Sequence, residues 1–281
     1  AGTISKLAES EKIYFTYISP SMDLPEDTHK LYPDLIDPVD EFAEKKIQES
    51  LDKNFDGQKD IEKHIEIIEG KILDNLLKMI VRKNIDLVVI KRSSITHQIE
   101  KLPEKLARKA PCSVLVIPED YKQVNYSNIL LPNDLSEYGD NSYDVAMAYA
   151  KAASLSSITQ VMVYKVPTGF HKTGKTYDEF AEIMKNNKKN EFSCFIDKYK
   201  ENDIETKPLY ILNDKVHSGI LEAQIQTKAD LLVLSTQSRT SGAAIILSSV
   251  TEKVISESPV PVIAVKEKGS GLTFLKALLQ L

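Results

Sequence analysis

The segment that most constrains this chain is residues 229–268, which reads as strand, polar loop, helix and strand. The predicted strands 230–234 and 260–265 are apolar throughout after Asp230, the pattern of strands that are buried on both faces of a parallel sheet. A serine-rich loop and a helix at 248–255 separate them. Residues 85–120 contain a fainter copy of the same unit. A chain that repeats such a unit is expected to be an α/β protein.

The same alternation extends over the rest of the chain. Apolar and β-branched runs predict strands at 12–18, 64–68, 86–90, 113–117, 128–132, 160–166, 208–212, 230–234 and 260–265. Helical spacing of apolar residues predicts helices at 39–51, 72–81, 102–110, 138–153, 177–199 and 216–225. This order predicts two tandem Rossmann-like domains, each built on a doubly wound parallel sheet.

The repeat can be aligned residue by residue. Asp86 matches Asp230 at an offset of 144, whereas Pro111 matches Pro259 at 148. The loop between these positions is therefore four residues longer in the second half, and insertions belong in surface loops. We expect a first domain at 1–121, a second at 122–268 and an apolar tail at 269–281.

The alignment also predicts a gap at the start. Near the amino terminus Pro20 matches Pro167 at an offset of 147, which places residue 1 opposite Ala148, in the middle of a predicted helix. The first half thus has no counterpart of residues 128–147, which hold the first strand of the second half. We expect the native polypeptide to begin upstream.

Composition excludes several classes of function. The chain carries 36 basic and 41 acidic residues, a net charge of −5, without the concentrated basic surface that nucleic-acid binding requires. No apolar run is long enough to span a membrane, and the first residues do not resemble a signal peptide. Cys112 and Cys194 are expected to be two buried thiols in a reducing, cytoplasmic environment.

Several motifs together resemble one family. They are Ile-Leu-Leu-Pro-Asn-Asp-Leu-Ser-Glu at 129–137, Val-Tyr-Lys-Val-Pro at 163–167, Ala-Asp-Leu-Leu-Val-Leu at 229–234, and Ser-Ser-Val-Thr-Glu-Lys-Val-Ile at 248–255 followed by Pro-Val-Pro-Val-Ile-Ala-Val at 259–265. In this order the chain resembles a tandem, two-domain universal stress protein of the UspA-like family, with the fold of the adenine nucleotide alpha hydrolases. The resemblance covers 122–266 and, more loosely, 5–118.

The resemblance implies a place for a nucleotide. In family members that bind ATP, an Asp ends the first strand, and Gly-x2-Gly-x9-Gly-Ser/Thr follows the fourth. Here the spacing is kept, but serine stands at the three glycine positions; a Cβ disfavours positive φ and blocks close backbone approach. The candidate nucleotide-contacting residues are Asp134, Val166, Ser235, Ser238, Arg239, Ser248 and Ser249.

Two functions remain open on this basis. The resemblance implies a cytoplasmic, non-catalytic stress-response protein with a degenerate nucleotide loop and no cofactor. The alternative is a member that binds ATP or AMP through its second domain. No Gly-x-Ser-x-Gly elbow, paired-histidine metal motif or other catalytic arrangement is present.

The same resemblance implies how the two halves of the chain, and copies of it, associate. It implies that the last strands, 113–117 and 260–265, pair with each other, as across a dimer interface, and a homo-oligomer is possible. Lys91, Arg92 and His97 form a basic cluster that is either a solvated loop or an anion site. The apolar run 272–281 is expected to dock on this chain, a partner subunit or a membrane surface.

Overall fold

The computed structural model describes residues 2–7, 10–19, 39–55, 61–92, 101–122, 126–237 and 247–266. The chain divides into two compact units, Ala1–Met79 and Ile80–Leu281. The tail 269–281, Ser238, Arg239 and His97 lie outside the described residues.

Unit 1 is built on a two-stranded parallel sheet. Strand β1 pairs with β2 along its full length, from Lys12 opposite Glu62 to Ser19 opposite Glu69. Gly70, with a φ of 121°, directly follows β2 and ends it. The helix at the start of the unit agrees with the alignment of residue 1 to the middle of a helix. The elements are α1 (Gly2–Leu7), β1 (Lys12–Ser19), α3 (Val39–Asn54), β2 (Glu62–Glu69) and α4 (Ile72–Lys83), whose last residues belong to unit 2.

Unit 2 contains a seven-stranded sheet in the order β3-β4-β9-β8-β5-β6-β7. Neighbouring strands are parallel except β4 and β9, which run antiparallel with Leu115 opposite Ile263. This pair confirms the predicted junction between 113–117 and 260–265. The strands are β3 (Leu87–Lys91), β4 (Ser113–Ile117), β5 (Ile129–Pro132), β6 (Ser157–Tyr164), β7 (Glu205–Leu212), β8 (Leu231–Ser235) and β9 (Val262–Val265).

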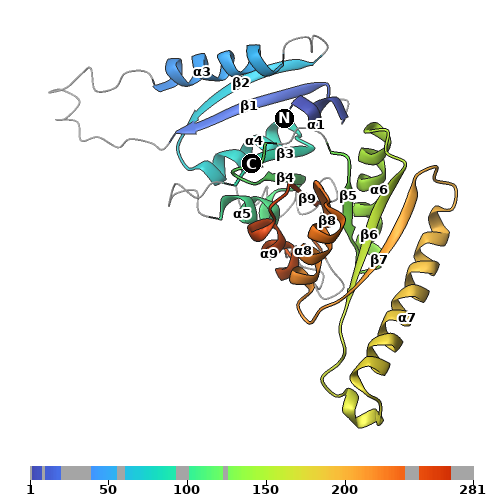
Figure 1. Cartoon of the computed structure of the whole chain (residues 1–281). Coiled ribbons are helices and arrows are strands. Elements are labelled where there is room, and N and C mark those ends of the chain that lie inside the picture. Colours follow the sequence, from blue (N-terminus) through green and yellow to red (C-terminus); the bar gives the residue numbers. More distant parts are fainter. Residues whose placement is uncertain are drawn as a thin grey trace, which may run out of the picture. The chain divides into compact units, whose positions relative to one another are not determined.

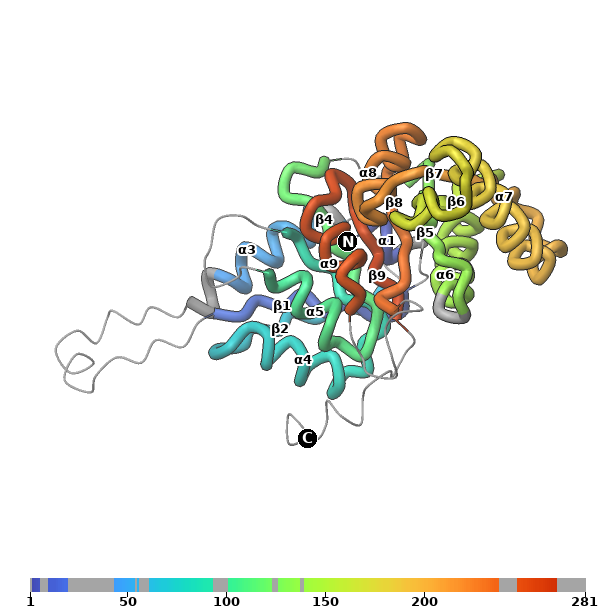
Figure 2. Tube along the Cα trace, turned by 90° about the horizontal axis from the view of Figure 1, so that it is seen from below, coloured from blue at the N-terminus to red at the C-terminus, as the bar shows by residue number. Residues whose placement is uncertain are grey.

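Helices cover both faces of this sheet. Both views show α6 and α7 together on one side (Figure 1 and Figure 2), and α8 packs against α9. This arrangement follows from right-handed crossovers that run outward from β5 in one direction and from β8 in the other. None of the described helices is long and apolar enough to cross a membrane. The helices are α5 (Leu102–Lys109), α6 (Glu137–Ala152), α7 (Tyr177–Ile196), α8 (Val216–Thr227) and α9 (Ser249–Glu257), with short 3₁₀ turns η2 (Phe170–Thr173) and η3 (Asp197–Tyr199).

The strands of the first half are divided between two sheets. β1 and β2 form the small sheet of unit 1, whereas β3 and β4 extend the large sheet of unit 2. In the second half, β5 stands between β8 and β6, the counterparts of β3 and β1. Because the described first half has no such central strand, its four strands do not form one sheet. The compact units consequently do not follow the repeat, whose predicted boundary lies at 121/122.

Side chains from each half bind the other across the β4–β9 junction. Arg92, which follows β3, donates to the carbonyl oxygens of Ile255 (2.8 Å), Ser256 (2.7 Å) and Ser258 (2.9 Å) at the end of α9. In the opposite direction, the buried Nζ of Lys266 donates to three carbonyl oxygens at the end of α5, those of Ala107 (3.1 Å), Arg108 (3.0 Å) and Ala110 (2.9 Å). Cations are favoured at helix carboxyl termini, so both contacts tie the two halves together.

The two cysteines differ from the prediction that both are buried. Cys112 is buried and free, and burial raises the pKa of its thiol to about 12, which leaves it unreactive. Cys194 is also free but exposed. It lies on α7, where Phe192 and Phe195 form the buried face, and its own position points away from that face.

Gln160 is a polar side chain in the apolar core of unit 2. It lies on β6 with no exposed surface, and among the described residues neither its amide nitrogen nor its amide oxygen has a hydrogen-bond partner. Because an unsatisfied buried polar group costs free energy, Gln160→Ile should raise the free energy of unfolding by about 1 kcal/mol. Urea denaturation measures the change. A loss of stability instead would mean that the amide is held by an ordered water.

Candidate functional site

The carboxyl ends of β8, β5 and β6 lie side by side at one edge of the large sheet. β5 stands between β8 and β6, and all three strands are parallel. From β5 the chain continues to β6 and β7 on one side of the sheet and then crosses to β8 on the other side of β5. The direction in which strands are added to the sheet therefore reverses at β5. Ligands of open α/β sheets bind in the crevice at such a switch point. The ends of these strands place Asp134, Val166 and Ser235 at the same edge.

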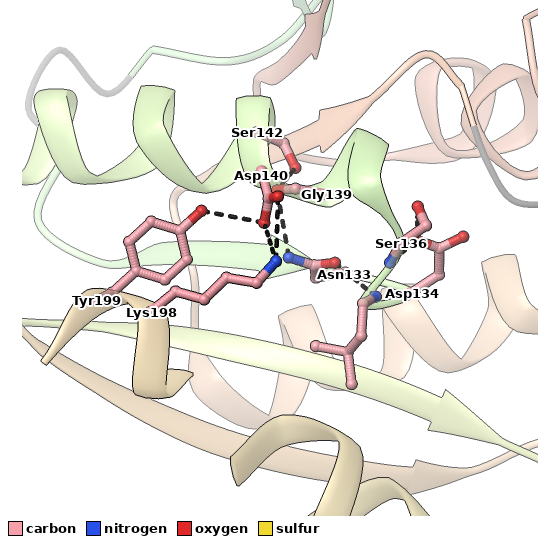
Figure 3. Close-up of polar contacts among 9 residues, drawn as sticks. Asn133, Asp134, Ser136, Gly139, Asp140, Ser142, Lys198 and Tyr199 are labelled. Carbon is pink, nitrogen blue, oxygen red and sulfur yellow. Dashed lines mark hydrogen bonds and ion pairs between the residues drawn. The ribbon is translucent and has the colours of Figure 1, made fainter. Parts of the chain in front are cut away.

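Asp134 lies in a tight turn between β5 and α6 (Figure 3). Its Oδ1 accepts hydrogen bonds from the backbone amide of Ser136 (3.1 Å) and from the Ser136 hydroxyl (2.6 Å). Leu135 takes the left-handed conformation, with φ of 60°, and its amide donates to Asn133 Oδ1 (2.7 Å). The Asp134 side chain is exposed, but one of its oxygens is already bound within the turn. Ser136 is the N-cap residue of α6, but its hydroxyl donates to Asp134 and does not cap the helix.

A glycine in the first turn of α6 makes this turn possible. A Cβ on Gly139 would lie 2.2 Å from Asn133 Oδ1, closer than any real contact. Asn133 is buried and holds Leu135, so a side chain at 139 would displace the turn that carries Asp134. Neither Asn133 nor Gly139 is among the predicted nucleotide-contacting residues, because both support the turn and do not belong to the nucleotide-binding pattern.

Asp140, the residue after Gly139 in α6, joins this helix to η3, the short turn that follows α7 (Figure 3). It accepts a hydrogen bond from the Tyr199 hydroxyl (3.0 Å) and pairs with Lys198 (3.3 Å). Burial, together with the Asp140 carboxylate, raises the pKa of Tyr199, so the phenol keeps its proton and acts as a donor. The contact is therefore structural: it anchors the start of α6 beside the strand ends.

The serines that replace the loop glycines are engaged in local hydrogen bonds. Ser248, the N-cap of α9, has φ of −63° and accepts a bond on its hydroxyl from the amide of Thr251 (3.1 Å). Its own amide donates to the carbonyl oxygen of Thr236 (3.0 Å). The Ser235 hydroxyl accepts a bond from the Gln237 amide (3.1 Å). Ser248 and Ser235 thus stabilise the loop ends themselves.

Two threonines that the sequence analysis did not name complete these ends. Thr236 is buried, and its amide donates to the carbonyl oxygen of Val265 (3.0 Å) on β9. The hydroxyl of Thr251, also buried, donates to the carbonyl oxygen of Ser235 (2.9 Å) and lies 2.9 Å from the Ser248 hydroxyl. Thr251 is the third residue of α9, where its hydroxyl can reach the N-cap residue Ser248. The spacing of three residues between Ser248 and Thr251 could have predicted this contact from the sequence.

The other candidates are placed as follows. Val166 is buried just beyond β6, and Ser249 is exposed at the first position of α9. Ser238 and Arg239 lie outside the described residues, so the structure brings together five of the seven candidates along one sheet edge. Of the basic cluster in the first half, Arg92 binds carbonyl groups of α9, and that role occupies the residue.

Neither the surface pocket on α8 nor a metal-binding group adds to the candidate site at the strand ends. A hollow of about 480 Å³ lies on α8 and is lined by Ser218, Leu221, Glu222, Ile225 and Gln226, not by residues of the strand ends. Within the described ranges, no group of three His, Cys, Asp or Glu side chains is arranged to hold a metal ion.

Comparisons with known proteins give a consistent assignment. The model of the universal stress protein family matches residues 125–266. Universal stress protein MJ0577 of Methanocaldococcus jannaschii is 24% identical over 165 residues, which cover 52% of this chain and 99% of that protein.

Solved structures match over nearly the whole chain. A putative universal stress protein from Pseudomonas aeruginosa covers 98% of this chain and 99% of its own, with a TM-score of 0.65 at 13% identity. A universal stress protein from Archaeoglobus fulgidus covers 94% of this chain and 91% of its own, with a TM-score of 0.61 at 17% identity. These likenesses show the tandem α/β fold, and the family match covers half of the sequence. The chain belongs to the universal stress protein family.

Proposed function

We propose that this protein is a non-catalytic universal stress protein whose nucleotide loop is degenerate and which acts by binding other molecules. The proposal places it in the cytoplasm, because its two cysteines, Cys112 and Cys194, are both free thiols.

The hydrogen bonds of Ser248 carry the proposal. In a phosphate-binding loop, backbone amides and a hydroxyl at the start of the helix remain available to the anion. Here the Ser248 amide donates to Thr236, and the Ser248 hydroxyl accepts from Thr251. The Asp134 oxygen Oδ1 is likewise held by Ser136. Groups that would face a nucleotide are therefore used to close the loop ends.

Calorimetric titration with ATP and magnesium tests this proposal. We expect no binding tighter than about 1 mM to the native sequence. A variant with Ser235→Gly, Ser238→Gly and Ser248→Gly should gain ATP binding, since glycine removes each Cβ and is itself an acceptable N-cap. The matched control adds Asp134→Ala to the triple variant and should abolish the gain.

A second candidate, an ATP- or AMP-binding member, is favoured by one observation. The first amides of α9, at Ser249 and Val250, stand at a helix start where intrahelical acceptors are lacking. Micromolar binding of ATP to the native sequence, lost in Asp134→Ala, would support this candidate and overturn the main proposal. Sustained nucleotide hydrolysis would contradict both.

A further inference from the structure

The outer side of α8 carries an exposed apolar surface that the proposed function leaves unused. Ile225 is 72% exposed, more than any other large apolar side chain in the described part of the chain. It lies in the hollow of about 480 Å³, beside Leu221. The residues that line this hollow are spaced three and four apart along one side of the helix: Ser218, Leu221, Glu222, Ile225 and Gln226. An exposed apolar hollow of this kind marks a surface that another molecule can cover.

The packing of α8 on the large sheet keeps this surface outward. The opposite side of the helix holds the buried residues Gly219, Ile220 and Ala223. A Cβ on Gly219 would lie 2.8 Å from Cγ1 of Val163 on β6, so glycine lets the helix lie close to the strand. A rotation that hid Ile225 would lift these residues off the sheet. Ile225 is therefore buried only when another segment or molecule binds over α8.

A second exposed apolar surface lies on the connection from β6 to α7. The ring of Phe170 contacts those of Tyr177 (5.6 Å between centroids) and Phe180 (6.5 Å), and Tyr177 is 43% exposed. We call these three residues the aromatic cluster. A Cβ on Gly169 or Gly174 would meet no atom within 4 Å, so the loop that carries Phe170 stands clear of the rest of the fold. Figure 1 shows the start of α7 at the lower tip of the picture, away from α8 and α9.

The aromatic cluster and the hollow carry opposite charges. Lys172 and Lys175 are exposed on the loop of the cluster, and the segment 165–177 contains no acidic residue. Of the two acidic residues that follow, Glu179 is held in the capping box of α7. Among the described residues that line the hollow, Glu222 is the one charged side chain, and it is exposed. Opposite charges on two surfaces favour their association and fix their orientation.

We propose that the aromatic cluster of one copy of the chain inserts into the α8 hollow of a second copy, with Lys172 and Lys175 beside Glu222. The chain itself supplies both complementary parts, and this makes a second copy the occupant. Both surfaces belong to unit 2, so the contact needs nothing from unit 1. Because the two surfaces differ, the contact is heterologous, and association can continue beyond a dimer. It does not require a bound nucleotide.

Sedimentation velocity of the whole chain over a range of concentrations tests this contact. We expect the average mass to rise beyond that of a dimer as the concentration increases. A cluster variant, Phe170→Ser with Tyr177→Ser, and a hollow variant, Ile225→Ser, should each remain monomeric with a native thermal transition. Ile183→Ser, which changes an exposed residue of α7 outside the cluster, is the matched control and should associate as the native chain does.

An equimolar mixture of the cluster and hollow variants distinguishes a heterologous contact from other modes of association. The hollow of the first variant and the cluster of the second are intact, so the mixture should form dimers and nothing larger. A mixture that stays monomeric contradicts the proposal. So does a native chain that remains monomeric up to about 1 mM, or a cluster variant that associates by itself.

Charge reversal tests the orientation of the contact. Glu222→Lys should raise the dissociation constant roughly tenfold, because it places like charges together. Mixing it with Lys172→Glu and Lys175→Glu on a second chain should restore association between the two. Native association of Glu222→Lys by itself would show that the hollow is not part of the contact.

The competing occupant of the hollow is another segment of the same chain, such as 269–281. A thiol introduced by Ile225→Cys reports on this, with the exposed Cys194 as an internal reference for alkylation, read by mass spectrometry. The introduced thiol should react like Cys194 in dilute solution and more slowly when native chain is added in excess. Protection that is equal at every concentration would mean that the same chain covers the hollow. That result, or no protection at any concentration, overturns the proposal.

Discussion

Replacing Lys266 by methionine should lower the free energy of unfolding by about 3 kcal/mol. The Lys266 ammonium is buried and donates to the carbonyl oxygens of Ala107, Arg108 and Ala110. Methionine fills a similar volume but donates nothing, so buried carbonyl groups at the end of α5 lose their partner. Urea denaturation gives the stability, and hydrogen exchange of α5 gives the local effect.

The matched control is Lys253→Met. Lys253 is exposed on α9, and a substitution there should change stability by no more than about 0.5 kcal/mol. If the two variants were equally stable, the bonds from Lys266 to α5 would not contribute to holding the halves together. Exchange in α5 should be faster only in the Lys266 variant.

Asp230→Ala should cost a similar amount, about 3 kcal/mol, for a different reason. The Asp230 carboxylate is buried and accepts hydrogen bonds from the amide and hydroxyl of Ser127, at 2.8 and 2.7 Å, and from the amide of Asn128 at 2.9 Å. Its loss leaves two backbone amides without an acceptor at the start of β5. Asp230→Asn keeps one acceptor oxygen, so it should lower the free energy of unfolding by less than Asp230→Ala does.

The internal repeat supplies a control at the equivalent position. Asp86 corresponds to Asp230 but is exposed, so Asp86→Ala should lower the free energy of unfolding by less than Asp230→Ala does. If Asp86→Ala and Asp230→Ala lost the same unfolding free energy, the loss would come from removing an aspartate that precedes a strand. It would not come from losing the hydrogen bonds that hold the start of β5.

The strand and helix order was predictable because apolar periodicity depends on local sequence. β4 lies at the predicted 113–117, and α4 and α8 begin where the spacing predicts. The division of the first-half strands was not predicted, because sheet membership depends on which strand is available as a neighbour. Cys194 was misjudged for a related reason: its sequence context is apolar, but exposure depends on which face of α7 packs.

The sequence predicted where the candidate site lies in the fold, but it did not predict the hydrogen bonds within the site. Spacing placed Asp134 and Ser248 at strand and helix ends, where the structure has them. It did not reveal that Thr236 and Thr251 satisfy Ser248, nor that Ser136 binds Asp134. Such bonds depend on distances between loops that no single-sequence pattern encodes.

The antiparallel β4–β9 junction has a consequence for how the two halves can change. In a homodimer of one repeat, every substitution would appear on both sides of the junction and would have to be compatible with itself. Here Arg92 binds one helix end and Lys266 the other, and neither is matched by the same residue in the opposite half. One half can therefore gain a longer loop or lose a motif while the other half keeps its sequence. The duplication thus allows the two halves of one polypeptide to take on different functions.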